Sequence, residues 1–389
     1  MKYFFLMIVL VFSCKNTRTS EIKGLKKEDP NTKLVYVDSP VRAFSKVQKE
    51  NDSIISRFNE CINSNKRSDY RKFWDRSDTT FFKTPYVDLY NIINFDYPTY
   101  KPTIIAIQKL NDKYLFKIAL MGEPEGFNSL YVIYNLYVMK NNKGEFVFQN
   151  PLNETLKEWN TKIVENIKYY YNSNSTIDEK EVANQIDFET ELITFLEVDK
   201  IEYKYIVCKN SHESLSVLGY DYEDSMFFTN QEGGITFSNQ KVIFAGNNKA
   251  TYHHEVTHIY TFEHFPEINI IIDEGFATYL GGSKGLSYKE HIKVLNEYIS
   301  KNKISLSEYL FDTQKRYTVL NDSTTILYSS GALLCDLAYK KGGKEKLFDL
   351  MNGGRSDREL KSTIEDIFNI DIANFDRFIE NELNTFFDE

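Results

Sequence analysis

The first part of the chain combines one helical pattern with four strand-like runs. Apolar residues recur at helical spacing from Phe44 to Ile62. Runs rich in β-branched and aromatic residues follow, separated by turn sequences such as Asn-Asp and Asn-Asn-Lys-Gly, at residues 103–110, 114–120, 130–139 and 145–149. One helix followed by an antiparallel meander predicts a small N-terminal α+β domain over residues 41–150. No catalytic constellation is visible in this region.

A second apolar stripe follows directly. Its members recur at helical spacing, and they are Leu156, Trp159, Ile163, Ile167 and Tyr170. The stripe predicts a connecting helix over residues 151–172 that buries one face in a core or between domains. The polar segment at residues 172–175 then marks a domain boundary.

The remainder, residues 173–389, is expected to form a mostly α-helical domain with a short β-sheet. A helix is predicted near residues 181–196, a strand at 201–207, and two short strands around a turn at 233–238 and 241–246. From residue 250 the pattern is helical to the end, with glycine pairs between helices and a final amphipathic helix over residues 370–386. The expected fold class is therefore α+β.

Composition and charge narrow the classes of function. The 389 residues carry a formal net charge of −9 and no long basic run, which argues against a nucleic-acid partner. The length suffices for two domains with their own cores. Cys61, Cys208 and Cys335 are widely separated, so they form neither a disulfide framework nor a C-x-x-C metal site, and we expect buried thiols.

The N-terminus predicts export. Lys2 precedes ten apolar residues, a length typical of a signal peptide and too short for a transmembrane helix. The segment ends in Val-Phe-Ser-Cys, which resembles the lipobox of bacterial lipoproteins. That resemblance implies a signal peptide over residues 1–13, a lipidated Cys14, a polar tether over residues 14–40, and an extracytoplasmic protein anchored to a bacterial membrane, periplasmic or at the cell surface. An ordinary secretory signal with an incidental cysteine is the alternative.

The candidate chemistry lies in the predicted helix over residues 250–262. His254 and His258 are four residues apart and therefore share one side of a helix, where their imidazoles can reach one metal ion. Glu255 lies between them, placed to act on a metal-activated water. Glu274, on a second short helix closed by a glycine pair, can supply a third ligand. Three protein ligands and an open position are the arrangement of catalytic zinc, and the alternative is a solvated His/Glu face on an ordinary helix.

These residues resemble the gluzincin metallopeptidases, the peptidase-MA-like group that includes the aminopeptidase N and thermolysin branches. The motifs that carry the resemblance are His254-Glu255-Val256-Thr257-His258 and Asp273-Glu274-Gly275-Phe276-Ala277. The resemblance implies one zinc ion held by the two histidines and Glu274, with Glu255 as general base. It covers roughly residues 201–389.

The chain departs from the gluzincin pattern in three places. Only 15 residues separate His258 from Glu274, fewer than in aminopeptidase N relatives. Thr278 stands where thermolysin-like members carry an acid. The aminopeptidase signature glycine-x-methionine-glutamate-asparagine is absent, which weakens the case for an aminopeptidase.

A later segment, Tyr328-Ser329-Ser330-Gly331, resembles a helix start of the same superfamily. The resemblance implies that the Tyr328 hydroxyl points at the zinc site and stabilises an oxyanion. The alternative for Tyr328 is a core aromatic residue with one polar tip. Ligand histidines usually donate their second N–H to an outer acceptor, for which Asp273 and Thr278 are candidates.

The sequence therefore predicts a zinc-dependent peptidase that hydrolyses peptide bonds through a metal-activated water, acting on a peptide or protein substrate. The alternative is a catalytically silent lipoprotein that keeps the peptidase fold as a binding or scaffold module. Retention of Glu255 beside its predicted ligands favours the enzyme. In gluzincins an edge strand before the metal helix binds extended peptide, and one of the two strands at residues 233–246 is a candidate for that role.

Overall fold

The structure is a computed structural model that describes residues 33–45, 49–64, 66–76, 78–95, 99–223, 226, 232–321 and 323–388. The predicted signal peptide, the lipidated Cys14 and most of the tether lie outside these residues. The chain divides into two units, Met1–Leu34 and Val35–Glu389, and all that follows concerns the second. Its fold is α+β, as the sequence predicts.

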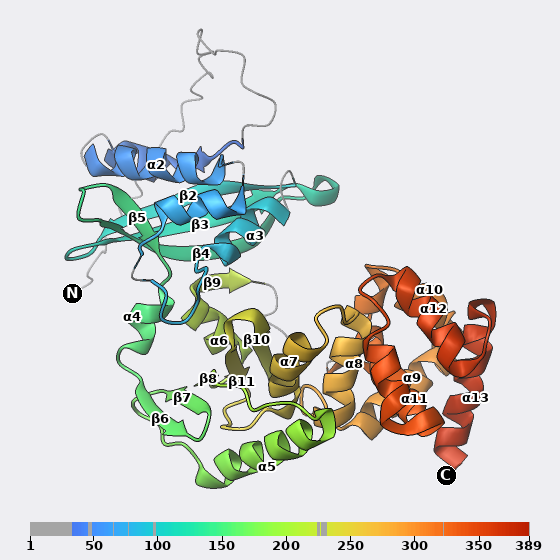
Figure 1. Ribbon diagram of the computed structural model, residues 1–389. Helices are drawn as coiled ribbons and strands as arrows, with labels where there is room; N and C mark the ends of the chain where they lie inside the picture. Colours follow the sequence, from blue (N-terminus) through green and yellow to red (C-terminus); the bar gives the residue numbers. More distant parts are fainter. Residues whose placement is uncertain are drawn as a thin grey trace, which may run out of the picture. The chain divides into compact units, whose positions relative to one another are not determined.

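Residues 36–149 supply five strands of a six-stranded sheet and the helices beside it (Figure 1). The strand order is β1-β2-β3-β4-β5, and β9 pairs with β4; their bounds are β1 Tyr36–Val37, β2 Tyr100–Lys109, β3 Tyr114–Gly122, β4 Ser129–Lys140, β5 Phe146–Gln149 and β9 Tyr220–Glu223. The helices are α1 Ser39–Ser45, α2 Lys49–Ile62, α3 Val87–Phe95 and the 3-10 turns Arg67–Phe73 and Pro124–Gly126. The four predicted strands are confirmed. The single helix predicted from Phe44 to Ile62 is confirmed over Lys49–Ile62, whereas Phe44 belongs to a separate helix, α1; α3 was not predicted.

Aromatic packing between α2 and the sheet explains the order of these elements. Phe58 of α2 meets Phe116 of β3 with ring centroids 5.1 Å apart and Phe148 of β5 at 6.0 Å, and all three side chains are fully buried. Burial alternates along β4 with a period of two residues, which directs every second side chain into this core.

The predicted connecting helix over residues 151–172 is wrong. Only Leu152–Leu156 is helical (α4), and a β-hairpin follows, with β6 at Asn160–Val164 and β7 at Ile167–Tyr171. Glu165 takes a left-handed conformation with φ 50° at the turn. The run Ile-Lys-Tyr-Tyr-Tyr favours a strand because aromatic and β-branched side chains pack well on a pleated surface. Ile163 lies on β6 and is 71% exposed, whereas Ile167 lies on β7 and is fully buried, so their helical spacing was coincidental.

The hairpin belongs to a second, five-stranded sheet in the order β10-β11-β8-β7-β6. The remaining strands are β8 Tyr203–Val207, β10 Gly233–Phe237 and β11 Val242–Gly246, and the helices of this region are α5 Glu179–Leu196, α6 Ser211–Leu218 and the 3-10 turn Ser238–Gln240. β7, β8 and β11 run parallel, and β10 pairs antiparallel with β11 at the sheet edge. The predicted helix, strand and strand pair of this region are confirmed.

The C-terminal part is mostly helical. Its elements are α7 His253–His264, α8 Ile270–Gly281, α9 Tyr288–Asn302, α10 Leu306–Leu310, α11 Ile326–Met351, α12 Asp357–Phe368, α13 Phe375–Asp388, the 3-10 turns Lys315–Tyr317 and Ile372–Asn374, and the short strands β12 Val319–Asn321 and β13 Thr324–Thr325. The β12–β13 pair interrupts the stretch predicted as helical throughout. The last helix begins at Phe375, later than the predicted residue 370. Gly342 and Gly343 break the helical conformation of α11, as the predicted glycine punctuation indicates.

The last two features of the fold are the state of the cysteines and the length of the helices. Cys61, Cys208 and Cys335 are free thiols with buried side chains, which confirms the prediction. Within the part of the chain that the structure describes, no helix has the length and apolar character to cross a bilayer.

Candidate metal centre

Helix α7 buries an unusual set of side chains. It contacts β10 and β11 of the second sheet, α5 and α8, and eight consecutive residues, 254–261, are buried. Four of them are titratable: His254, Glu255, His258 and Tyr260. Buried titratable groups need hydrogen-bond partners or charge compensation. The surroundings of this stretch therefore determine its chemistry.

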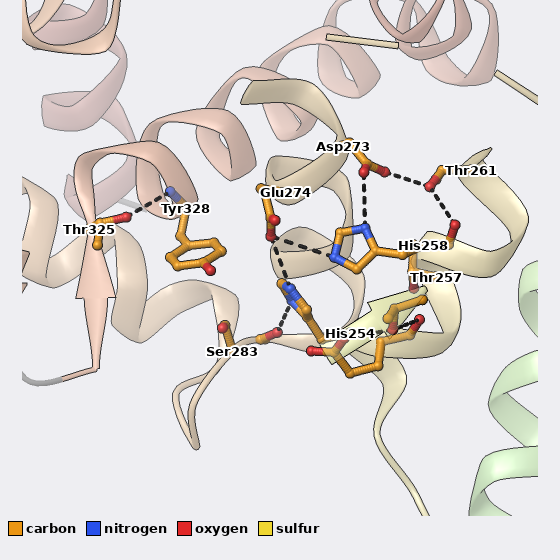
Figure 2. A network of polar contacts seen from close by, with 12 residues as sticks. His254, Thr257, His258, Thr261, Asp273, Glu274, Ser283, Thr325 and Tyr328 are labelled. Carbon is orange, nitrogen blue, oxygen red and sulfur yellow. Dashed lines mark hydrogen bonds and ion pairs between the residues drawn. The ribbon is translucent and has the colours of Figure 1, made fainter. Parts of the chain in front are cut away.

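Helix α8 brings Glu274 to the two histidines. Its first turn is capped by Asn269, whose side chain accepts a hydrogen bond from the Ile271 N–H. The Glu274 Oε2 atom lies 3.2 Å from Nε2 of His254 and 3.5 Å from Nε2 of His258 (Figure 2). One ligand atom from each of the three residues lies within 4.8 Å of the others. The structure thus brings together the three residues predicted as metal ligands.

The outer ring nitrogens are held by acceptors. Nδ1 of His254 donates to the Gly282 carbonyl at 2.9 Å, and Nδ1 of His258 donates to Oδ2 of Asp273 at 3.1 Å. When a ring is neutral, its outer acceptor keeps the proton on Nδ1, so that the Nε2 lone pair faces Glu274, as metal ligation needs. Thr261 holds the other carboxylate oxygen of Asp273 at 2.5 Å. Asp273 and Thr278 were the two predicted acceptors for the second N–H of a ligand histidine. Asp273 accepts this hydrogen bond from His258, whereas the Thr278 hydroxyl is buried and bonds to neither imidazole.

A buried hydrogen-bond chain that the sequence did not indicate supports the Gly282 acceptor. His291 on α9 is fully buried, and its Nε2 lies 3.2 Å from the carbonyl of Ser283, the residue after Gly282. Its Nδ1 lies 2.6 Å from Oγ1 of Thr324, which in turn lies 2.8 Å from Oγ of Ser329 in the first turn of α11. His291 therefore connects, through hydrogen bonds, the loop that contains Gly282 and Ser283 to helix α11, which carries Tyr328.

Electrostatics couple the three predicted ligands. Burial disfavours a charge on His258, but the carboxylates of Asp273 and Glu274 outweigh it and raise the pKa of His258 well above its ordinary value. Burial opposes ionisation of Glu274, but the neighbouring His258 and His254 lower its pKa. Without a metal the site is therefore held together by a protonated imidazole and a carboxylate.

Glu255 faces the edge strand β10. The Thr236 hydroxyl lies 2.7 Å from its Oε2 and 3.1 Å from its main-chain oxygen. A Cβ added to Gly234 would lie 2.4 Å from the Glu255 carboxyl carbon, so glycine at that position leaves room for the carboxylate. Only 6% of Glu255 is exposed.

Tyr328 stands beside the histidine pair. Its ring centroid lies 5.9 Å from that of His254, and it belongs to the first turn of α11, which Thr325 caps (Figure 2). The negative charge of Glu274, followed by burial and the charge of Glu255, raises the pKa of Tyr328 well above its ordinary value. Its hydroxyl therefore stays protonated and able to donate.

Two glycines set the distance between α8 and α11. A Cβ on Gly331 would lie 2.1 Å from the Ile271 carbonyl oxygen, and one on Gly275 would lie 2.2 Å from the Gly331 carbonyl carbon. Gly275 directly follows Glu274, and Gly331 lies one turn after Tyr328. The close backbone approach at this crossing places Tyr328 next to the predicted ligands.

The other histidines on α7 lie away from this cluster. His253 stacks on Phe188 with ring centroids 4.0 Å apart, and its Nε2 contacts Asn184 at 2.9 Å. His264 is half-buried at the end of the helix.

The donor set fits zinc chemistry. Two imidazole nitrogens and one carboxylate oxygen converge, each histidine is held at its far nitrogen, and the cluster is largely buried, which are features of a catalytic zinc site. No protein-family model matches this chain, and no curated protein matches it in sequence. The geometry of the site and the motif resemblance are therefore what indicate its chemistry.

Proposed function

We propose that this protein is a zinc-dependent peptidase of the gluzincin type. The observation that carries the proposal is the convergence of His254, His258 and Glu274 on one point. The ring of Tyr328 lies against that of His254, and the charge of the buried Glu255 contributes to the raised pKa of Tyr328. Zinc bound there would polarise a carbonyl and lower the pKa of water toward about 7. The residues around the ligands match the needs of that reaction.

Two side chains would handle the proton and the developing charge. Glu255 would accept a proton from the attacking water and deliver it to the leaving amine. The protonated hydroxyl of Tyr328 would donate a hydrogen bond to the oxyanion as it forms. Asp273 and the Gly282 carbonyl would keep both imidazoles in the orientation that ligation needs.

The edge strand β10 supports a peptide as the substrate. Among the strands that the structure describes, β10 pairs only with β11. A strand at a sheet edge can bind an extended peptide by main-chain hydrogen bonds. Because β10 also contacts Glu255 through Thr236, a peptide added there would lie close to the proposed general base.

Cleavage of a peptide library by the zinc-loaded full chain tests this proposal, with the ends of each product mapped. We expect amide cleavage by the wild type and none by Glu255→Gln, which keeps its zinc because Glu255 is not a proposed ligand. Cleavage by Glu255→Gln at the wild-type rate would contradict the mechanism. Zinc retention without any cleavage by the wild type would favour the silent binding module.

We further propose that the protein is a lipoprotein anchored through Cys14, a proposal supported by the sequence of the first 14 residues. Fractionation of cells that express the full chain tests it: the wild type should sediment with membranes, and Cys14→Ser should not. Equal sedimentation of both forms would contradict the anchor.

A further inference from the structure

We infer that the hydroxyl of Thr236 on strand β10 positions the carboxylate of Glu255, which makes Thr236 a positioning residue of the proposed reaction. The inference depends on the proposed function, because it assigns Thr236 a role toward the general base named there. It goes further in assigning part of the reaction machinery to the edge strand.

The contact between the two side chains is short and specific. Thr236 Oγ1 lies 2.7 Å from Oε2 of Glu255, within the normal range for a hydroxyl that donates to a carboxylate. The Glu255 side chain is 6% exposed, so water competes poorly for this hydrogen bond. A hydroxyl has one proton, and the 3.1 Å distance to the Glu255 main-chain oxygen makes the carboxylate the nearer acceptor.

The strand presents two positions to this carboxylate. Gly234 and Thr236 are two residues apart, so they face the same side of β10. At Gly234 a Cβ would lie 2.4 Å from both the Cγ and the carboxyl carbon of Glu255, closer than any side chain permits. The strand thus leaves a gap for the carboxylate at one position and offers a donor at the next.

The sheet makes this donor rigid. β10 pairs with β11 through five successive residue pairs, including Thr236 with Ile243, whose side chain is fully buried. The β-branched side chain of threonine is restricted about its first torsion angle. Thr236 therefore offers its hydroxyl from a fixed place, in contrast to a donor on a flexible loop.

A purely structural role predicts something different. If the hydroxyl served only to join β10 to helix α7 through the Glu255 main-chain oxygen, its loss would lower the stability of the fold and leave turnover intact. If it orients the carboxylate, its loss would lower turnover while zinc binding persists. A measurement of kcat therefore distinguishes the structural role of the hydroxyl from the positioning role.

The test compares Thr236→Val, which keeps the shape and strand propensity but lacks the hydroxyl, with Thr236→Ser, which keeps the hydroxyl. Thr190→Val is the control, because the Thr190 hydroxyl donates to the Ile186 carbonyl within α5, away from the proposed site. All forms are full-length and zinc-loaded. Loss of a hydrogen bond to a charged group predicts a fall in kcat of roughly tenfold to a hundredfold for Thr236→Val. We expect KM, zinc affinity and melting temperature to stay near wild type, and Thr236→Ser to recover most of the turnover.

A second measurement is independent of turnover. Crystal structures of the zinc-loaded variants should show the Glu255 carboxylate in the same orientation in wild type and Thr236→Ser, and rotated in Thr236→Val. An active wild type with unchanged kcat in Thr236→Val would overturn the inference and leave the proposed function intact. An unchanged carboxylate in the Thr236→Val structure would also overturn it. A wild type that binds zinc and cleaves no peptide would instead overturn the proposed function, and this inference with it.

Discussion

Helices α2 and α7 both pack against a β-sheet, but they bury different kinds of side chain. Helix α2 lies along the six-stranded sheet (Figure 1). It buries Ile54, Phe58, Cys61 and Ile62, with Asn51 as its one buried polar residue, and buries none of its charged residues. Helix α7 buries two histidines and a glutamate within the same stretch as its apolar residues. The first pattern is that of an ordinary amphipathic helix, and the second has a cost that packing alone does not explain.

Buried polar groups in the two regions differ in how they are satisfied. Near α2, the Asp78 carboxylate accepts hydrogen bonds from the Trp74 side chain at 2.9 Å and the Asn150 backbone N–H at 2.8 Å. Near α7, Nε2 of each predicted histidine ligand faces the same oxygen of Glu274. Neutral imidazole nitrogens and a carboxylate facing one another need a proton or a cation between them. The Asp78 carboxylate is satisfied by protein donors, whereas the α7 cluster needs a shared proton or a cation, which the proposed metal would supply.

The comparison of the two helices predicts that a substitution in the apolar helix α2 causes the largest loss of stability. Ile54→Ala removes a fully buried side chain and should lower the free energy of unfolding by about 2–5 kcal/mol. Chemical denaturation measures this change, with Ile163→Ala, whose side chain is 71% exposed, as the control. Zinc content of the folded Ile54→Ala protein should match wild type. Loss of zinc from folded protein would show that the two regions are not separable.

Tyr328→Phe tests whether Tyr328, beside the histidines of α7, stabilises the oxyanion. Removal of one oxyanion donor should lower kcat about 10²–10³-fold, equivalent to about 2.7–4 kcal/mol of barrier. Steady-state kinetics measure the loss, and Tyr339→Phe on the same helix, 41% exposed, is the control. Wild-type kcat in Tyr328→Phe would assign Tyr328 to the core, as the alternative interpretation of the sequence has it.

Asp273→Asn tests the outer hydrogen bond to His258. Substitution of a residue that hydrogen-bonds to a metal ligand weakens metal binding by roughly 10–100-fold, and we expect a loss in this range because Asp273 orients the His258 imidazole. Competition with a chelator of known affinity measures it. Asp349→Asn, which removes a carboxylate paired with Lys346 on the surface, should leave zinc affinity unchanged. Equal affinities for wild type and Asp273→Asn would show that the contact does not support a ligand.

The smallest predicted effect is the pH dependence of zinc binding, which follows from the proton that zinc must displace. In the metal-free protein the pKa of His258 is raised by Asp273 and Glu274, so this imidazole carries a proton at neutral pH. Zinc binding must displace that proton, and affinity should rise about tenfold per pH unit below the raised pKa and level off above it. Calorimetry in two buffers of different ionisation enthalpy counts the protons released. Release of no proton at pH 7 would contradict a protonated His258.

The sequence predicts the ligand cluster well because its geometry is local. Four-residue spacing fixes where His254 and His258 point, and a second short helix after a turn leaves few places for Glu274. The supporting groups are harder to predict. The Gly282 acceptor is a main-chain oxygen, which every residue type has, and Thr236 reaches Glu255 only because a sheet edge lies against the helix.

The same limit on prediction from sequence applies to the fold. Strands β2 to β5 follow from alternation and turn residues. The β6–β7 hairpin, in contrast, carries apolar residues that recur at helical spacing although they lie on two different strands, so the pattern predicted a helix there. His291 gave no signal, since its partners Ser283 and Thr324 lie eight and 33 residues away and only the packed helices bring them together.

Metal content tests the central claim most directly. Elemental analysis of the purified full chain after zinc loading and desalting should find one zinc per wild-type chain and none in His258→Ala, with both proteins folded by circular dichroism. A folded wild type without bound zinc, or an equal zinc content in the folded His258→Ala protein, would contradict the assignment of His254, His258 and Glu274 as a metal centre.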